Sequence, residues 1–410
     1  MPFKTPSTIR MLAAQIFALF GFASYPVCLK AIQSDWGLTN FESGVIASSF
    51  FFGYVCVVPF ATALTDRIDA RRIYLLGSFI SVMGLFLFSF VQQNYVLACL
   101  LMALNGAGFA ATYMPGLKII SDRVNPGSDL SRAVSFYTAF FGIGVGLSYL
   151  ISGWILQNLN WQAVFALIAI GPLCSLLVVF FSIKPSSHTH LYQAISIQLS
   201  DIFPLQQWRL VLQNENSAKF IMGYAFHCLE LFATRNWLVA YFLFCATLNP
   251  NISIELITVV VGCINFIGVP SSIIGNEFAR KWGRLPWIHT IMIGSAIAAI
   301  SLCLVAGMSW WIVFFLAAIH AIFIMADSAT LTAGLVLSVQ EKVKGAAMGL
   351  HSLMGFGGGL IGPALFGYVL DITGGQTTQN AWLFAYIAIG LPSILYVIYN
   401  LTHLKEAKKL

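Results

Sequence analysis

Charged residues are scarce in this sequence. Asp, Glu, Lys and Arg together make up 9% of its 410 residues, whereas about 25% of the residues in a soluble domain are charged. Hydrophobic residues make up 59%, and the mean hydropathy is +0.84. This composition indicates a polytopic membrane protein. The net charge of +6 is therefore interpreted through its distribution over the loops, not as a sign of nucleic-acid binding.

Several chemical motifs are also absent. The sequence has no G-x-x-x-x-G-K-[ST] motif and no soluble segment large enough for an ATPase domain, so we expect any transport to be driven by a gradient. The eight cysteines form no C-x-x-C pair and lie in or beside apolar segments, which is typical of small buried side chains rather than disulfides or zinc ligands. No nucleophile–base pair resembles an active site. We therefore expect a protein that is not an enzyme and has no cofactor or metal.

Twelve apolar segments are long enough to span a bilayer as helices. They cover residues 9–31, 41–64, 73–92, 95–118, 133–156, 162–183, 217–248, 254–277, 287–307, 309–338, 346–370 and 381–403. The first follows Lys4 and Arg10 and has no clear small-residue cleavage site, so we expect a retained membrane helix and not a removed signal peptide.

The predicted fold is an all-α polytopic membrane protein with twelve transmembrane helices in two six-helix halves. The N-terminal half covers residues 1–183 and the C-terminal half covers residues 217–410. The stretch between them, 184–216, is interpreted as a cytoplasmic linker. It contains amphipathic pieces with a tryptophan, which are also suited to the membrane interface.

The basic residues predict the orientation. Every one of the 21 Lys and Arg residues, except Lys30 and Arg235, falls in a segment that is cytoplasmic if the N-terminus is cytoplasmic. The predicted outer loops carry acidic residues instead, such as Asp35 and Asp371. By the positive-inside rule both termini are cytoplasmic. The short loops favour the inner membrane of a bacterium.

The segment 217–248 carries three ionisable residues within nine positions, namely His227, Glu230 and Arg235. Each would cost about 2.5–3.5 kcal/mol at the bilayer centre if it faced lipid. At 3.6 residues per turn, one stripe of this helix holds His227, Glu230, Thr234, Trp237 and Tyr241. Arg235 points about 140° away from Glu230 by the same geometry. We interpret the stripe as facing a water-filled cavity. The alternative is a helix–helix contact in which Glu230 pairs with a neighbour.

Two basic turns lie at equivalent places in the two halves. The first reads T-A-L-T-D-R-I-D-A-R-R and the second reads G-N-E-F-A-R-K-W-G-R. Their recurrence about half the chain apart indicates a duplicated transporter fold.

In this feature, and over essentially its whole length, the sequence resembles the major facilitator superfamily. The family's loop motif runs Gly-x-x-x-Asp-Arg-x-Gly-x-Arg-Arg, although Thr62 and Asp69 stand where glycines are usual. The resemblance implies a cytoplasmic gate. Its residues would be Asp66, Arg67, Arg71 and Arg72 in the first turn, and Arg280, Lys281 and Arg284 in the second. The H-x-x-E-L…R-x-W and A-D-S stretches loosely resemble a bacterial branch of cyanate and nitrite permease-like proteins.

The resemblance also implies that the first, fourth, seventh and tenth helices line a central cavity. The residues expected to bind substrate there are Tyr25, Lys30, Asn105, Tyr113, Arg235, Trp237 and Tyr241. Lys30 and Arg235 would attract an anion, although Lys30 could also reach the lipid headgroups and Arg235 could neutralise a carboxylate.

Proton coupling requires groups whose charge responds to a change in solvation. His227, Glu230 and Asp327 have this chemistry. We hypothesise that Glu230 or Asp327 carries the proton and that His227 tunes it. The alternative is that Asp327 pairs permanently with Arg235 or another cation. Sodium coupling stays open.

The sequence thus predicts a monomeric secondary transporter that imports a small organic, anionic solute with protons by alternating access. One alternative is a proton-driven exporter of drugs, metabolites or a siderophore. Segment 133–156 lacks the Gly-Pro pair usual in drug–proton antiporters of the superfamily, which disfavours drug efflux. An alternative of another class is a membrane sensor or assembly factor with a degenerate transporter fold.

Overall fold

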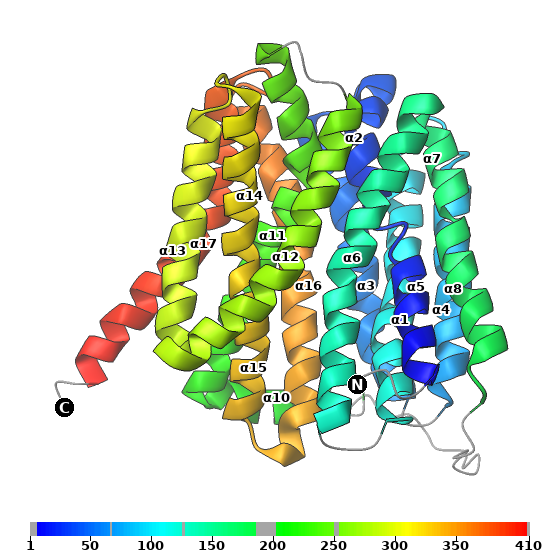
Figure 1. Ribbon diagram of the computed structural model, residues 1–410, viewed down its shortest axis with the longest axis vertical. Helices are drawn as coiled ribbons and strands as arrows, with labels where there is room; N and C mark the ends of the chain where they lie inside the picture. The colour runs from blue at the N-terminus through cyan, green and yellow to red at the C-terminus, as the bar shows by residue number, and fades with distance from the viewer. Residues whose placement is uncertain (1–5, 66–67, 125–127, 186–201, 250–253, 408–410) are drawn as a thin grey trace. The chain divides into compact units, whose positions relative to one another are not determined.

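All regular structure in the described part of the chain is helical (Figure 1). The computed structural model describes residues 6–65, 68–124, 128–185, 202–249 and 254–407. Eleven helical segments there are long and apolar enough to cross a membrane. Together with the first predicted segment, which is split, they account for the twelve expected spans. The all-α polytopic membrane fold is therefore confirmed.

Contacts divide the chain into two compact units. Unit 1 comprises Met1–Trp36 and Ser49–Pro204, and unit 2 comprises Gly37–Ser48 and Leu205–Leu410. The predicted halves, 1–183 and 217–410, fall within units 1 and 2 respectively, except for the twelve residues Gly37–Ser48. These residues include the first turns of helix α3, so α3 contributes to both units.

Unit 1 is a bundle of apolar helices. It contains α1 (Pro6–Ala18), α2 (Ser24–Trp36), the larger part of α3 (Asn40–Leu64), α4 (Ala70–Phe88), α5 (Tyr95–Ser121), α6 (Ser128–Asn158), α7 (Trp161–Ile168) and α8 (Ile170–Ser182). Asparagine side chains cap the N-termini of two of these helices. Asn94 accepts from the Leu97 amide at the start of α5, and Asn160 accepts from the Ala163 amide at the start of α7. Each therefore satisfies an amide that a helix leaves unpaired at its N-terminus.

The first membrane segment differs from the expected continuous helix over 9–31. A turn separates α1 from α2, and a serine from α6 satisfies the backbone groups that the turn leaves free. Ser148 Oγ donates to the Phe20 carbonyl and accepts from the Ala23 amide at 2.9 Å. An interruption in a membrane helix is tolerated when neighbouring side chains complete the backbone hydrogen bonds in this way.

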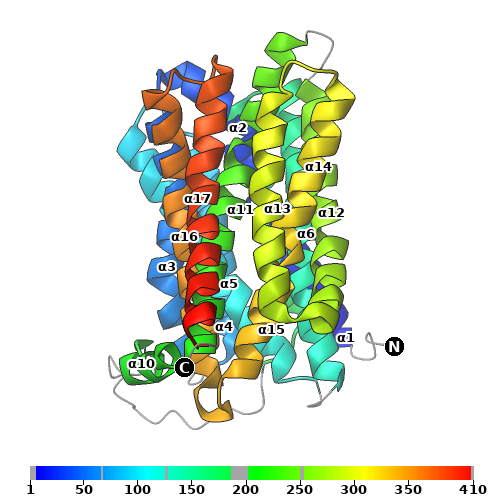
Figure 2. The ribbon, with the colours of Figure 1, turned by 90° about the vertical axis from the view of Figure 1, so that its left-hand side faces the viewer.

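Unit 2 is arranged around one long helix. Its helices are α10 (Leu205–Gln213), α11 (Glu215–Leu248), α12 (Ile254–Trp282), α13 (Arg284–Leu304), α14 (Trp310–Ala326), α15 (Ser328–Ser338), η1 (Glu341–Val343), α16 (Lys344–Ile372) and α17 (Gln379–Ala407). Helix α11 packs against α10, α12 and α14–α17. In its most apolar window 78% of the residues are buried, a larger share than in any other candidate span. Figures 1 and 2 show α13 and α17 side by side along one face of this unit.

The first turns of α3 are fixed to unit 2 by an acidic side chain. Asp371, near the end of α16, accepts hydrogen bonds from the Asn40 amide at 3.1 Å and from the Phe41 amide at 2.7 Å. Thr39 and Glu42 form a reciprocal capping box at the same helix start. The amides that α3 leaves unpaired at its N-terminus are thus satisfied, and a carboxylate lies at the positive end of the helix dipole.

Candidate functional site

Among the described residues, every buried Asp, Glu, Lys, Arg and His belongs to unit 2. They are Lys219, His227, Glu230, Arg235, His289, His320, Asp327 and His351. Burying an ionisable side chain is costly unless it is paired or hydrogen-bonded. Unit 1 has buried polar residues, such as Gln15 and Asn105, but these are uncharged. The buried ionisable chemistry is therefore concentrated in one of the two units.

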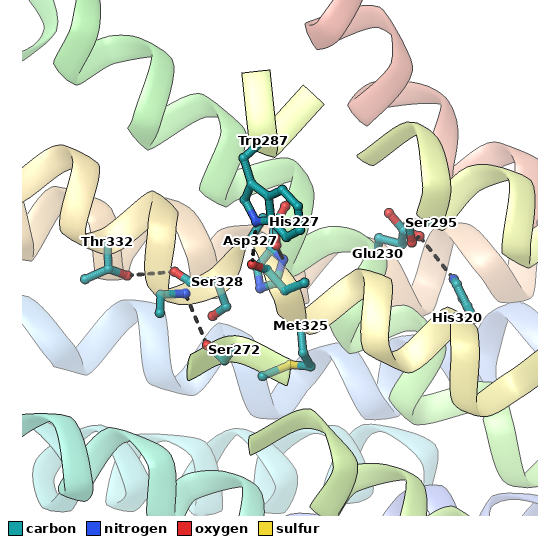
Figure 3. A network of polar contacts seen from close by, with 12 residues as sticks. His227, Glu230, Ser272, Trp287, Ser295, His320, Met325, Asp327, Ser328 and Thr332 are labelled. Atoms are coloured by element: carbon teal, nitrogen blue, oxygen red, sulfur yellow. Dashed lines mark hydrogen bonds and ion pairs between the residues drawn. The ribbon is translucent and has the colours of Figure 1, made fainter. Parts of the chain in front are cut away.

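Two histidine–carboxylate pairs connect α11 with the α14–α15 segment (Figure 3). His227 Nδ1 on α11 lies 2.8 Å from Asp327 Oδ1, and His320 Nε2 on α14 lies 3.2 Å from Glu230 Oε1 on α11. Ser295 Oγ on α13 donates to the same Glu230 oxygen at 2.5 Å. Each segment thus supplies one imidazole and one carboxylate, and both carboxylates are at most 4% exposed. The predicted coupling residues His227 and Asp327 come together directly, and Glu230 pairs separately.

Asp327 occupies a break in the tenth membrane segment. Helix α14 ends at Ala326 and α15 begins at Ser328. Trp287 Nε1 on α13 donates to the Ala326 carbonyl at 3.1 Å, and the Ala329 amide donates to Ser272 Oγ on α12 at 3.2 Å. Side chains from two neighbouring helices thus complete the backbone hydrogen bonds around the break (Figure 3). Asp327 thus lies between two helices, α14 and α15, and at this break its carboxylate contacts His227.

A small pocket in unit 2 lies beside the second pair. Its volume is about 30 Å³, which is room for about two water molecules. It is lined by Leu231, Thr234, Arg235, Leu238, Ile264, Asn265, Gly268, Ala317, His320, Ala321, Ile324 and Met325. His320 therefore belongs both to the pocket wall and to the Glu230 pair. This shared residue connects the pocket to the buried carboxylate.

Arg235 is the cation of this pocket, and it is 6% exposed. Its Nε donates to Asn265 Oδ1 on α12 at 3.0 Å, and its Nη2 approaches the Met325 sulfur at 4.0 Å. Asn265 Nδ2 donates to the Val261 carbonyl, so the amide oxygen of Asn265 is directed toward the arginine. The recorded ion-pair partner of Asp327 is His227. A guanidinium at a mostly apolar pocket is suited to binding a carboxylate through two parallel hydrogen bonds.

The aromatic residues of the predicted stripe make structural contacts. Trp237 and Tyr241 are fully buried. Trp237 Nε1 donates to the Pro363 carbonyl at 3.0 Å, and Tyr241 Oη donates to the Leu302 carbonyl at 2.7 Å. Their polar atoms connect α11 to α16 and α13. A role of these two residues in substrate binding stays a prediction.

The other predicted substrate-binding residues lie in unit 1. Lys30 is exposed, and Tyr25 is buried with its ring edge-on to Phe88. Asn105 is 4% exposed, and within the described residues no hydrogen-bond partner reaches its Nδ2. Tyr113 stacks on Tyr137 with ring centroids 5.7 Å apart. Asn105 is therefore the residue of this group with an unused donor.

The predicted gate residues have local partners where the structure describes them. Arg71 Nη2 donates to the Phe180 carbonyl at the end of α8, and Arg72 is exposed. Asp66 and Arg67 lie outside the described residues.

In the second basic turn, Arg280 pairs with Glu277 at 3.1 Å and Arg284 donates to Asn276 at 3.0 Å. Lys281 is exposed, and Gly283 turns the chain between α12 and α13 at φ +94°, a conformation that favours glycine. A gating role for either turn stays a prediction.

Five residues of this region were not among the predicted site residues. They are Tyr224, Asn265, Ser295, His320 and His351. Each is a polar residue in an apolar segment, which is a usable signal in a membrane helix. Their partners depend on which helices pack together, and that is not readable from one helix. In the described ranges, no three His, Cys, Asp or Glu side chains are grouped so as to hold a metal ion.

Comparisons with known proteins agree with this architecture. The family model described as Major Facilitator Superfamily matches residues 11–333. The hexuronate transporter of Bacillus subtilis (strain 168) is 24% identical, and the alignment covers 93% of this chain and 91% of that protein. The quinolone resistance protein NorA of Staphylococcus aureus (strain MRSA252) is 22% identical over 98% of each chain.

Two solved structures have the same fold at low sequence identity. The nucleoside transporter NupG has a TM-score of 0.73 at 15% identity, over 98% of this chain and 100% of that chain. A bacterial homologue of the human lysosomal transporter Spinster, in an inward-facing and occupied conformation, has a TM-score of 0.73 at 14% identity over 97% and 95% of the two chains.

Proposed function

Because the chain belongs to the Major Facilitator Superfamily, whose matched members are membrane transporters of small solutes, we propose that it imports a small organic anion together with protons. The observation that carries this proposal is the position of His320. This residue lines the Arg235 pocket and also pairs with the buried Glu230 carboxylate. A solute bound at the pocket would therefore alter the surroundings of a proton-binding group.

The pocket favours an anionic group on the solute. Arg235 and the amide of Asn265 provide the polar contacts, and most of the other lining residues are apolar. The pocket has room for about two water molecules, so only a small group of the solute would enter it. We therefore assign this pocket to the charged end of the solute. The hexuronate transporter is named for an anionic solute, which supports the same class.

The two pairs supply the groups for proton coupling. Each carboxylate lies within hydrogen-bonding distance of an imidazole nitrogen, so a proton can pass between the two groups of a pair. In this proposal Glu230 and Asp327 hold the co-transported proton, and His320 and His227 exchange it.

Membrane placement and gating are part of the proposal. The positive charge in the predicted cytoplasmic loops supports a bacterial inner membrane with both termini in the cytoplasm. The two basic turns would form the cytoplasmic gate of alternating access. We propose that the protein acts as a monomer.

Proteoliposomes with an imposed pH gradient test the coupling. Parent protein, Glu230→Gln, Asp327→Asn and the control Asp122→Asn would be compared for accumulation of glucuronate, lactate, benzoate and succinate. Asp122 pairs with Lys118 at the surface, so its variant controls for loss of a carboxylate outside the membrane segments. We expect gradient-driven accumulation of at least one acid by the parent and the control, and its loss in at least one of the other two variants. Accumulation by all four proteins at equal rates would refute the coupling roles.

A second candidate function is export, favoured by the similarity to NorA over 98% of each chain. Right-side-out vesicles loaded with a fluoroquinolone or a lipophilic cationic dye distinguish it. Proton-driven loss of several unrelated compounds would favour an exporter. A sensor or assembly factor would instead retain its activity with alanine at both Glu230 and Asp327.

A further inference from the structure

A third buried histidine, His351, lies near the paired groups but takes part in neither pair. It is 3% exposed and lies seven residues after the start of α16 at Lys344, which corresponds to about 10 Å along the helix. That end of α16 follows basic residues and is predicted to be cytoplasmic. His351 therefore lies between the buried pairs and the predicted cytoplasmic surface.

The ring of Tyr224 stacks on both His351 and His227, the histidine of the His227–Asp327 pair. The ring of Tyr224 on α11 stacks on His351 with centroids 3.7 Å apart and an interplanar angle of 16°. The same tyrosine ring stacks on His227 with centroids 5.7 Å apart and an angle of 18°. The two imidazoles are thus held nearly parallel to one aromatic ring.

Each imidazole uses one nitrogen and leaves the other without a recorded partner. His227 Nδ1 pairs with Asp327, and His351 Nε2 lies 3.1 Å from Thr332 Oγ1. Within the described ranges, no hydrogen-bond partner reaches His227 Nε2 or His351 Nδ1, although both atoms are buried. A buried polar atom without a partner calls for a functional or structural reason. Two such nitrogens, on imidazoles that stack on the same tyrosine ring, suggest a path for a proton.

We propose that His351 is a proton-relay residue that receives the co-transported proton from His227 and passes it toward the cytoplasmic end of α16. This inference rests on the proposed proton-coupled import. The proton of the Asp327 carboxyl group moves to His227 Nδ1, while the proton on His227 Nε2 is released to a bridging water molecule. That water delivers a proton to His351 Nδ1. His351 releases its Nε2 proton to Thr332 Oγ1, while the original hydroxyl proton of Thr332 passes to water on the predicted cytoplasmic side. The total charge is conserved: one proton leaves the site, and Asp327 is left as a carboxylate.

The surroundings of His351 contain few competing charges. From α11 it stacks on Tyr224, whose ring also stacks on His227, and from α15 it contacts Thr332. Tyr396 of α17 belongs to the same core cluster as the neighbouring residue Leu350. Arg209 of α10 lines a surface groove beside Leu350, and Lys342 of η1 is exposed. The ionisable partner on the interior side is therefore the His227–Asp327 pair.

Two substitutions of His351 distinguish a role in proton transfer from a role in packing. His351→Gln keeps a polar group within reach of Thr332, and His351→Phe keeps a ring that stacks on Tyr224, but neither can carry a proton. The matched control is His289→Gln. His289 is buried in the same unit, but its ring contacts Tyr396 and not Tyr224.

The experiment uses proteoliposomes with an internal pH-sensitive dye and the same four acids, glucuronate, lactate, benzoate and succinate. Removal of a side chain that transfers a proton slows the proton-transfer step by a factor of about 10² or more. We expect both His351 variants to slow solute-dependent proton entry by at least about tenfold relative to counterflow of the same solute, and His289→Gln to leave this ratio unchanged. The pH profile of uptake is expected to change in the His351 variants alone.

Three outcomes would refute either the proposed function or the relay, and they can be told apart. If the parent shows no solute-dependent proton entry, the proposed function fails. If the parent couples and both His351 variants keep the parental ratio of proton entry to counterflow, the relay is refuted. If proton entry and counterflow fall equally in both variants, His351 acts through packing and the relay is again refuted.

Discussion

Replacement of Arg235 is the sharpest perturbation of solute binding. In Arg235→Gln the amide side chain can still bond Asn265, whose oxygen accepts from the arginine at 3.0 Å, but the positive charge is lost. Truncating one partner of a buried, hydrogen-bonded charge pair costs about 2–5 kcal/mol. We take about 3 kcal/mol from this range, which corresponds to an increase of about 10²-fold in KM for an organic anion.

Arg235→Lys provides a graded comparison. Lysine keeps the charge but loses the planar fork that binds both oxygens of a carboxylate. We expect its KM to rise about tenfold, as for the loss of one charge-assisted hydrogen bond of about 1.5 kcal/mol. Arg123→Gln is the control, because Arg123 bonds the backbone carbonyls of Ile119 and Lys184 in unit 1.

Initial rates of anion uptake against concentration measure these effects, with melting temperatures to confirm folding. The expected order of KM is parent and Arg123→Gln lowest, then Arg235→Lys, then Arg235→Gln. A folded Arg235→Gln protein with a KM within twofold of the parent would refute the assignment of the pocket to the solute anion.

Three further substitutions test the supporting structure. Trp287→Phe leaves the buried Ala326 carbonyl without its donor and is expected to destabilise the protein by about 1–3 kcal/mol, measured as a lower melting temperature; an unchanged value would contradict this role. Ser295→Ala removes a donor to Glu230 worth about 1.5–3 kcal/mol, so proton-coupled uptake should fall about tenfold or more, whereas equal uptake would show that the bond does not contribute. Asp371→Ala removes the acceptor at the start of α3 and should cost about 0.5–2 kcal/mol of stability; no loss in thermal unfolding would contradict the capping role.

Much of the helical layout could be predicted from hydrophobic segments. The segment 217–248 corresponds closely to α11, Glu215–Leu248, and 95–118 corresponds to α5, Tyr95–Ser121. Polar caps and charged turns limit these segments, and both are visible in the sequence.

The breaks were not predictable from the same signal. No proline marks the turn between α1 and α2, and the interruption depends on Ser148, more than a hundred residues away, to satisfy the backbone. The break at Asp327 likewise depends on Trp287 and Ser272 from two other helices. Such interruptions are stabilised by tertiary contacts, which a local pattern does not contain.

The residues of the candidate site could be named from the sequence, but their pairing could not. Intramembrane His227, Glu230, Arg235 and Asp327 were identifiable by the cost of burying them. The sequence left open whether Asp327 pairs with an arginine, and the structure places it beside His227. Glu230 pairs with side chains of two neighbouring helices, and its partner His320 lines a pocket. That the stripe of Glu230 faces a water-filled cavity stays a prediction.

The central claim is that anion movement and proton movement are coupled through the two buried carboxylates. The most direct measurement is the number of protons that enter a proteoliposome for each anion taken up, recorded simultaneously with a pH dye and a labelled acid in the parent, Glu230→Gln and Asp327→Asn. The account predicts a fixed ratio of at least one in the parent and a loss of coupled proton entry in at least one variant. Anion uptake by the parent without proton entry, or an unchanged ratio in both variants, would contradict it.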